Sequence, residues 1–267
     1  MNILDKKEVN WEEDALHQNC PSITPYLLEN RPDAPLVLVI PGGGYQHRAY
    51  HEGEPVAEWL NLNGYHACVL RYQIAPIQNQ ITIEQGQIAI QMIRSSLGEW
   101  GLFSDIKVGV LGFSAGGHLA ATISNHYNEN SVNDNQSNTY SSRPDFQILC
   151  YPVITMEKHT HQGSKENLLG SNPEQNLIDK YSCEKIVHKD TPQAFIWTTA
   201  NDEAVPAFNS LKYAEALQAH DIPYELHIYQ DGRHGLGLAD EHPNTREWKN
   251  ACLDWLNGYI HQGEDSE

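Results

Sequence analysis

The sequence predicts one α/β domain in which helices cover a mostly parallel β-sheet, and three observations predict it. A chain of 267 residues has the length of one large domain of this class. Short apolar runs alternate with amphipathic stretches, as in a parallel sheet covered by helices. Gly112–Gly116 reads G-F-S-A-G directly after the apolar run Lys107–Leu111, which predicts a sharp turn from a buried strand into a helix.

Six apolar runs are the expected strands of this sheet. Each has the length of a buried strand, and amphipathic or polar stretches separate it from the next. In chain order the expected strands are Pro35–Pro41, His66–Tyr72, Lys107–Gly112, Phe146–Tyr151, Ala194–Thr199 and Tyr224–Tyr229.

Five stretches between and after these runs are the expected helices. They are Glu54–Asn63, Thr82–Glu99, Gly116–His126, Pro206–Ala219 and Asn244–Tyr259. In the second, Ile83, Ile90 and Ile93 recur at helical spacing and form a stripe that faces the core. In the last, Trp248 and Cys252 begin a similar stripe, and we interpret its aromatic residues as core packing.

Composition and charge exclude several partners. The formal net charge of −18 at pH 7 argues against tight binding to nucleic acid or to an anionic membrane, because phosphate contacts need clustered Lys and Arg.

The five cysteines are scattered and form no C-x-x-C pair, which is typical of a reducing compartment. The first residues have no apolar core of a secretory signal, and no stretch approaches the ~18–20 apolar residues of a membrane span. We therefore predict a cytoplasmic protein, and the sequence leaves its oligomeric state open.

Ser114 is the candidate nucleophile. The glycines on either side of it let strand and helix approach without side-chain clashes and hold the serine in a strained backbone conformation. The small residues from Gly116 onward predict that a helix starts under the serine, where its N-terminal N–H groups favour developing negative charge. A G-x-S-x-G motif in this setting is the nucleophile elbow of the α/β-hydrolase fold.

A serine nucleophile needs a base and a carboxylate that orients the base. Asp202 follows one expected strand and His234 follows the next, so the order serine, acid, histidine is that of α/β-hydrolases. Glu203 and Asp231 are rival acids, and we rank Asp202 first and Asp231 last, because Asp-Gly is a common turn pair. Asp202 is also a candidate helix cap, and His234 a candidate surface histidine.

The segment Pro41–Tyr45, which we call the oxyanion loop, reads P-G-G-G-Y after the first expected strand. Consecutive glycines let backbone N–H groups point into a site from conformations that other residues avoid. We expect the N–H of Gly43 or Gly44 to pair with that of Ala115 as an oxyanion hole. We predict that Tyr45 contacts the substrate, with packing in the core or in the wall as the alternative. No phosphate-binding motif follows these glycines.

The segment Thr155–Asp190 interrupts the alternation of strands and helices with polar and short helical material. We expect this cap segment to lie beside the active site as an insertion into a single domain, residues 1–267. Its histidines His159 and His161 are interpreted as polar surface. His47 and His51, after the oxyanion loop, are interpreted as pocket wall or solvated face, because no third metal ligand is apparent.

Taken in order, these motifs resemble those of bacterial α/β-hydrolase carboxylesterases, and most nearly the acetyl xylan esterase-like branch. The resemblance extends over roughly Pro35–Tyr259. The segments that carry the resemblance are P-G-G-G-Y at 41–45, R-Y at 71–72, G-V-L-G-F-S-A-G-G-H-L-A-A at 109–121, N-D-E-A-V-P at 201–206 and G-R-H-G at 232–235. The hormone-sensitive-lipase branch has His-Gly-Gly-Gly where this chain has Pro41–Gly44, which argues against direct membership there.

The resemblance implies a triad of Ser114, Asp202 and His234 acting on short acyl esters, including acetyl groups on sugars, without metal or cofactor. Two alternatives stay open. One is a peptidase of the prolyl-oligopeptidase type, although such enzymes usually carry a gating domain for which this chain has no room. The other is a catalytically silent hydrolase-fold protein used for binding. A glycosidase is not expected, because we find no paired carboxylates in a recognisable glycosidase arrangement.

Overall fold

The structure is a computed structural model that describes residues 1–9, 21–76, 79–127 and 140–261. The strands are β1 (Asn2–Ile3), β2 (Ser22–Tyr26), β3 (Leu36–Ile40), β4 (His66–Arg71), β5 (Val108–Phe113), β6 (Gln147–Cys150), β7 (Ala194–Thr199) and β8 (Tyr224–Tyr229). The α-helices are α2 (Glu54–Leu62), α3 (Asn79–Ser96), α4 (Ser114–Asn125), α5 (Gln162–Leu169), α6 (Gln175–Lys180), α7 (Phe208–Ala219) and α8 (Trp248–His261). Short 3-10 helices are η1 (Lys6–Glu8), η2 (Tyr50–Glu52), η3 (Cys183–Lys185) and η4 (Thr245–Glu247).

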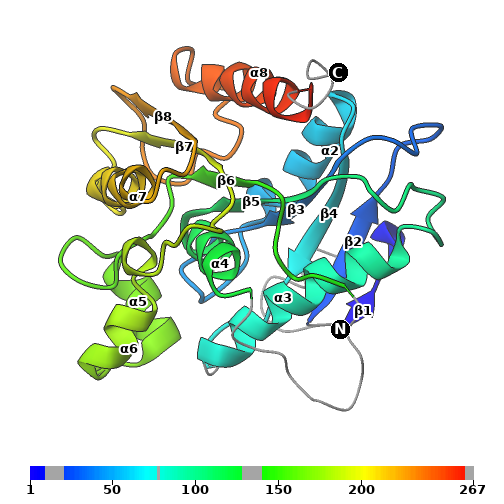
Figure 1. Ribbon diagram of the computed structural model, residues 1–267. Coiled ribbons are helices and arrows are strands. Elements are labelled where there is room, and N and C mark those ends of the chain that lie inside the picture. Colours follow the sequence, from blue (N-terminus) through cyan, green and yellow to red (C-terminus); the bar gives the residue numbers. More distant parts are fainter. Residues whose placement is uncertain (10–20, 77–78, 128–139, 262–267) are drawn as a thin grey trace.

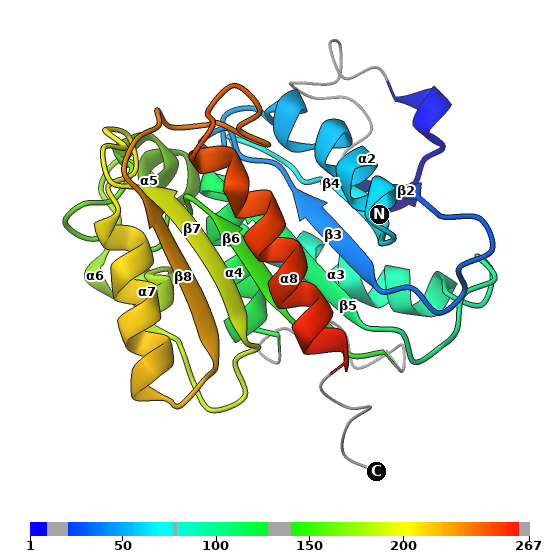
Figure 2. The same cartoon turned by 90° about the horizontal axis from the view of Figure 1, so that it is seen from above.

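Within the described residues, the strands form one sheet in the order β1-β2-β4-β3-β5-β6-β7-β8 (Figures 1 and 2). Neighbouring strands run parallel except for β2 and β4, which are antiparallel. The predicted α/β class with a mostly parallel sheet is confirmed. Every residue of β3 and β5 is buried, which explains why these strands are continuous apolar runs without alternation.

Helices cover both faces of the sheet. On one face α2 and α8 pack through residues such as Leu60 and Trp248, and on the other face α3, α4 and α7 pack through Ile90, Leu119 and Tyr213 (Figure 1). All twelve residues of α4 are buried, because this helix runs under the middle of the sheet. Its Gly, Ala and Ser side chains are small enough for that close packing.

The structure differs from the prediction mainly at element ends and at the first strands. The helix expected from Gly116 begins at Ser114 itself, and the helix expected from Thr82 begins at Asn79. β1 and β2 were not predicted: β1 has two residues, and β2 is a short strand that contains Pro25. Helices α5 and α6 lie in the cap segment between β6 and β7, where short helical material was expected.

The candidate site residues lie together at the carboxyl ends of the parallel strands. The oxyanion loop follows β3, Ser114 follows β5, Asp202 follows β7 and His234 follows β8. Because the carboxyl ends of parallel strands lie at the same edge, loops far apart in the sequence meet there. Figure 2, which views the sheet from above, shows β7 and β8 side by side with β5 further in.

No helix among the described residues combines the length and the apolar character needed to cross a membrane. The cytoplasmic location stays a prediction.

Candidate active site

Ser114 lies at the junction of β5 and α4 with a backbone φ of 51°. This left-handed conformation is strained for a residue that carries a Cβ atom. The glycines around it are required by close packing: a Cβ on Gly116 would lie 2.1 Å from the Ile40 carbonyl oxygen, and one on Gly42 would lie 2.9 Å from the Ser114 Cβ. Gly116 of the G-x-S-x-G motif and Gly42 of the oxyanion loop therefore let helix, strand and loop meet at the serine.

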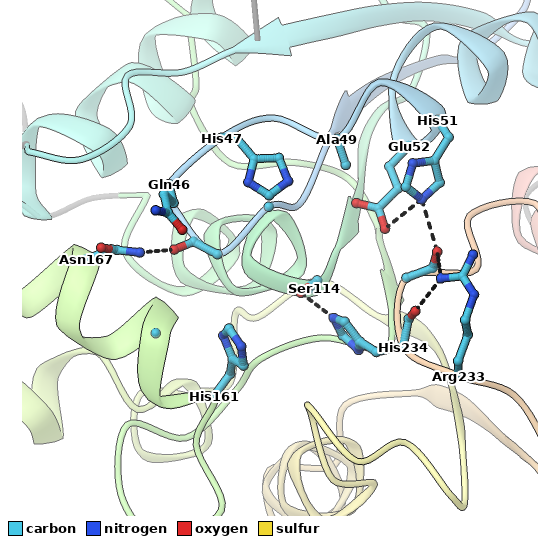
Figure 3. A pocket seen from close by; sticks show the side chains of 14 residues that line it. Gln46, His47, Ala49, His51, Glu52, Ser114, His161, Asn167, Arg233 and His234 are labelled. Atoms are coloured by element: carbon cyan, nitrogen blue, oxygen red, sulfur yellow. Dashed lines mark hydrogen bonds and ion pairs between the residues drawn. The ribbon is translucent and has the colours of Figure 1, made fainter. Parts of the chain in front are cut away.

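Ser114, His234 and Asp202 form a continuous chain of hydrogen bonds. The Oδ2 atom of Asp202 accepts from His234 Nδ1 at 2.6 Å, which fixes the ring proton on Nδ1. The other ring nitrogen, Nε2, is then free to accept from the Ser114 hydroxyl, and the two atoms are 2.8 Å apart (Figure 3). A hydroxyl in this position can give its proton to the imidazole as it attacks an electrophile.

The carboxylate of Asp202 is held firmly in place. It is 5% exposed, and its Oδ1 atom accepts from the backbone N–H groups of Ala204 and Val205, both at 2.9 Å. Asp202 therefore holds the turn that follows it but does not cap α7, whose N-cap is Ala207, and the turn contacts use only one carboxylate oxygen. The second oxygen is left for His234.

The rival acids lie elsewhere. Glu203 is exposed, and Asp231 is exposed and accepts a hydrogen bond from the side chain of Asn201. The Asn201 Oδ1 atom in turn accepts from Gly232 N at 2.9 Å. Asp231 thus helps to hold the segment Asp231–Gly237, which we call the histidine loop, and among the described residues its carboxylate makes no hydrogen bond to His234.

The oxyanion loop has an unusual backbone. Gly43, Gly44 and Tyr45 have φ values of 122°, 64° and 59°, so three successive residues have positive φ. Gly43 and Gly44 line the same cavity as Ser114. Ala115 follows the serine in the first turn of α4, where backbone N–H groups have no partner within the helix.

The predicted substrate contact of Tyr45 is not supported by its place in the structure. Its side chain is fully buried and does not line the cavity; it packs edge-on against Tyr72 at a centroid distance of 6.0 Å. The Tyr45 hydroxyl donates to His118 Nδ1 at 2.7 Å, because His118 Nε2–H donates to the Tyr181 carbonyl at 2.8 Å. Tyr45 therefore belongs to the core, which was the alternative, and fastens the oxyanion loop to α4.

His118 makes the stability of the protein depend on pH. Full burial lowers the pKa of its imidazole from 6.5 to about 4. The unfolded chain binds this proton below pH 6.5 and the folded chain does not, so the stabilisation is complete above pH 6.5 and is lost as the pH falls towards 4. The expected loss is about 3 kcal/mol of unfolding free energy.

His118→Gln keeps an acceptor and a donor but removes the titration. We expect a smaller loss of unfolding free energy between pH 7 and pH 4.5 for this variant than for the wild-type protein, measured by urea denaturation. Other groups titrate in both proteins, so the difference isolates His118. Equal losses in the two proteins would contradict the role given to this histidine.

Glu52 is a residue of the candidate site that sequence reasoning missed. It is 2% exposed; its Oε2 atom accepts from Gly42 N at 2.8 Å, and its Oε1 atom accepts from the Tyr151 hydroxyl at 2.6 Å. The Tyr151 oxygen also accepts from Gly237 N at 2.7 Å. One buried carboxylate therefore joins the oxyanion loop to the histidine loop. In the sequence, Glu52 is one polar residue of a polar stretch, and no signal sets it apart.

A cavity of about 300 Å³ opens over the Ser114 hydroxyl (Figure 3). It is lined by Gly43, Gly44, Gln46, His47, Ala49, His51, Glu52, Ser114, His161, Gly163, Asn167, Arg233, His234 and Gly235. His47 and His51 are thus pocket wall, one of the two interpretations made from the sequence. His161 belongs to the wall as well, although the sequence suggested polar surface. No group of three metal-binding side chains occurs in the part of the chain that the structure describes.

The cap segment contacts the oxyanion loop directly. The Asn167 side chain donates through Nδ2 to the Gly44 carbonyl at 2.8 Å. Together with His161 and Gly163, Asn167 places the beginning and middle of α5 on the wall of the cavity.

A family model described as BD-FAE matches residues 26–217 of the chain. The endo-1,4-beta-xylanase B of Butyrivibrio fibrisolvens is 35% identical over 245 residues, which cover 90% of this chain and 38% of that protein. The acetylxylan esterase of Xylanibacter ruminicola is 34% identical over 247 residues, which cover 90% of this chain and 49% of that protein. The chain therefore spans less than half the length of each of these relatives.

Solved structures are similar over nearly the whole chain. An acetyl ester-xyloside bifunctional hydrolase from Caldicellulosiruptor lactoaceticus superimposes with a TM-score of 0.87 and 41% identity, covering 91% of this chain and 89% of that one. A carboxylesterase from Lactobacillus plantarum superimposes with a TM-score of 0.73 and 25% identity, covering 92% and 96%.

Proposed function

Because the chain belongs to the BD-FAE family, we propose that it is a serine carboxylesterase that releases short acyl groups, above all acetyl groups, from carbohydrates. It has the α/β-hydrolase fold of its structural neighbours. The observation that carries the proposal is the hydrogen-bonded chain from Ser114 through His234 to Asp202, which ends in a cavity. The names of an acetylxylan esterase and an acetyl ester-xyloside hydrolase among its relatives favour acetylated xylose units as substrates.

In the proposed reaction the Ser114 oxygen attacks the ester carbonyl while His234 Nε2 takes the hydroxyl proton. Asp202 holds the Nδ1–H tautomer and stabilises the imidazolium that forms. The negative charge that develops on the carbonyl oxygen is received by the backbone N–H of Ala115 and that of Gly43 or Gly44.

Collapse of this tetrahedral intermediate breaks the bond to the alcohol, which leaves with the proton from His234. Ser114 then carries the acyl group. A water molecule gives a proton to His234 and attacks the acyl carbon, and the acid departs as the proton returns to Ser114. No step of this mechanism requires a metal or a cofactor.

The volume of the cavity supports a small substrate. Its volume of about 300 Å³ lies at the lower end of the range for ligand pockets. Within the described lining, Glu52 is the single carboxylate, and both of its oxygens accept hydrogen bonds from protein groups. A glycosidase needs two carboxyl groups beside the bond that it cleaves, so our proposal is limited to the ester. We further propose that the cap segment forms one wall of the substrate site.

A panel of substrates tests this proposal: p-nitrophenyl esters from acetyl to octanoyl, an acetylated methyl xyloside, and a chromogenic peptide. We expect kcat/KM to be highest for acetyl esters and to fall with acyl length, with acetate released from the xyloside and no cleavage of the peptide. Cleavage of the peptide without ester hydrolysis would instead indicate the peptidase alternative. Inactivity on every substrate would indicate the silent binding protein.

A further inference from the structure

A second imidazole faces Ser114 from the cap segment. His161 lines the cavity, and its ring lies 6.5 Å from that of His234 with the two planes inclined by 15°. Figure 3 shows the two histidines on either side of Ser114, carried by different parts of the chain. The mechanism above uses only one of them.

The protonation of the His161 ring follows from its neighbours. His161 is the N-cap of α5, and its Nδ1 atom accepts from the Ser164 backbone N–H at 3.2 Å and lies 2.8 Å from the Ser164 hydroxyl. A backbone N–H can only donate, so Nδ1 carries a lone pair and the proton of the neutral ring is on Nε2. Burial is the largest effect that lowers the pKa of His161, and the nearby His234 lowers it further, whereas Asp202 raises it. The net effect is a lowered pKa, which favours the neutral ring.

His161 is also held close to the oxyanion loop. A Cβ atom on Gly44 would lie 3.6 Å from His161 Cε1, and Asn167 of the same helix donates to the Gly44 carbonyl. Among the described residues, no group forms a hydrogen bond with the His161 Nε2–H. A neutral donor is therefore fixed in the wall of the cavity without a partner in that part of the protein.

The chemistry of an acetyl ester leaves few acceptors for this donor. The acetyl methyl group cannot accept a hydrogen bond. In the proposed mechanism the carbonyl oxygen accepts from backbone N–H groups, and the ester oxygen takes its proton from His234 as the alcohol leaves. The remaining acceptors are oxygens of the sugar. We propose that His161 donates through Nε2–H to the sugar hydroxyl next to the esterified position and so selects carbohydrate esters, an inference that rests on the proposed esterase function.

The substitution His161→Asn tests this role without removing the helix cap, because Asn is itself a favourable N-cap residue. His159→Asn is the matched control: it makes the same change two residues earlier in the cap segment. His159 does not line the cavity, and its ring stacks on Phe208 at 4.7 Å. Thermal melts of both variants establish that they are folded.

Three acetyl esters are compared by kcat/KM: a monoacetylated methyl xyloside with a free neighbouring hydroxyl, the same compound with that hydroxyl replaced by hydrogen, and p-nitrophenyl acetate. We expect wild-type protein to prefer the hydroxyl compound over its deoxy analogue by about tenfold, the effect of one hydrogen bond. In His161→Asn the preference should disappear, because kcat/KM falls more for the hydroxyl compound than for the deoxy compound or p-nitrophenyl acetate. His159→Asn should keep the preference.

The inference is overturned if His161→Asn keeps the preference for the hydroxyl compound, or if it lowers kcat/KM equally on all three esters, as a merely structural role would. The second result would place His161 in the support of the cap alone. Failure of the esterase proposal would look different, because wild-type protein itself would then hydrolyse none of the three esters.

Discussion

Ser114→Ala is expected to lower kcat on p-nitrophenyl acetate by about 10⁴-fold or more, on the pattern of other serine triads. The variant removes the atom that would attack the ester and leaves His234 with nothing to deprotonate. Alanine keeps the same Cβ atom, so the strained backbone at φ 51° is unchanged and the fold should persist. Steady-state kinetics together with circular dichroism provide the measurement.

Ser124→Ala is the matched control for this prediction. Ser124 lies on the same helix, α4, is buried like Ser114, and its hydroxyl donates to the Ala120 carbonyl at 2.7 Å within the helix. We expect its loss to leave kcat within about threefold of wild type. If Ser114→Ala retained most of the activity, the nucleophile would have to be sought elsewhere.

Asp202→Asn is expected to lower kcat by about 10⁴-fold, as the equivalent change does in a serine triad. An amide cannot reproduce the two acceptor contacts of this carboxylate, one to His234 and the other to the backbone of Ala204 and Val205. If the Asn oxygen keeps the backbone contacts, its NH₂ group faces His234 Nδ1 and favours the tautomer with the proton on Nε2. That nitrogen could no longer accept from Ser114.

Asp231→Asn and Glu203→Gln are the controls for the acid, because both side chains are exposed. We expect each to keep kcat within about tenfold of wild type. Measurement of kcat for the three variants ranks the acids directly. If Asp231→Asn or Glu203→Gln were the most damaging change, the orienting carboxylate would be that residue and not Asp202.

Much of the fold could be predicted because burial on both faces leaves a clear trace in the sequence. β3 and β5 are apolar at every position or interrupted only by glycine, and the helices beside them repeat apolar residues at helical spacing. The order serine, acid, histidine could be predicted because each residue lies in the turn or loop that follows a strand. β2 has no such pattern in the sequence, because it is short and contains Pro25. It forms its ladder with β4 only when the fold brings the two strands together.

The polar residues that surround the candidate site could not be predicted for a different reason. Glu52 is buried only because Tyr151, 99 residues away, and Gly42 are brought to it by the fold. The sequence suggested Tyr45 as a pocket residue because it follows the glycines, yet its hydroxyl donates a hydrogen bond to His118, 73 residues further along. His161 faces the serine only because α5 docks on Gly44. Contacts of this range leave no local pattern.

The central claim is that the Ser114 hydroxyl, activated by His234, is the group that becomes acylated. The most direct measurement is reaction of the wild-type protein with a fluorophosphonate, followed by proteolysis and mass spectrometry of the peptide that contains residue 114. We predict one adduct per chain, on Ser114, that forms as activity is lost and is absent from Ser114→Ala. Loss of activity with the adduct on another residue, or full activity with Ser114 labelled, would contradict the account.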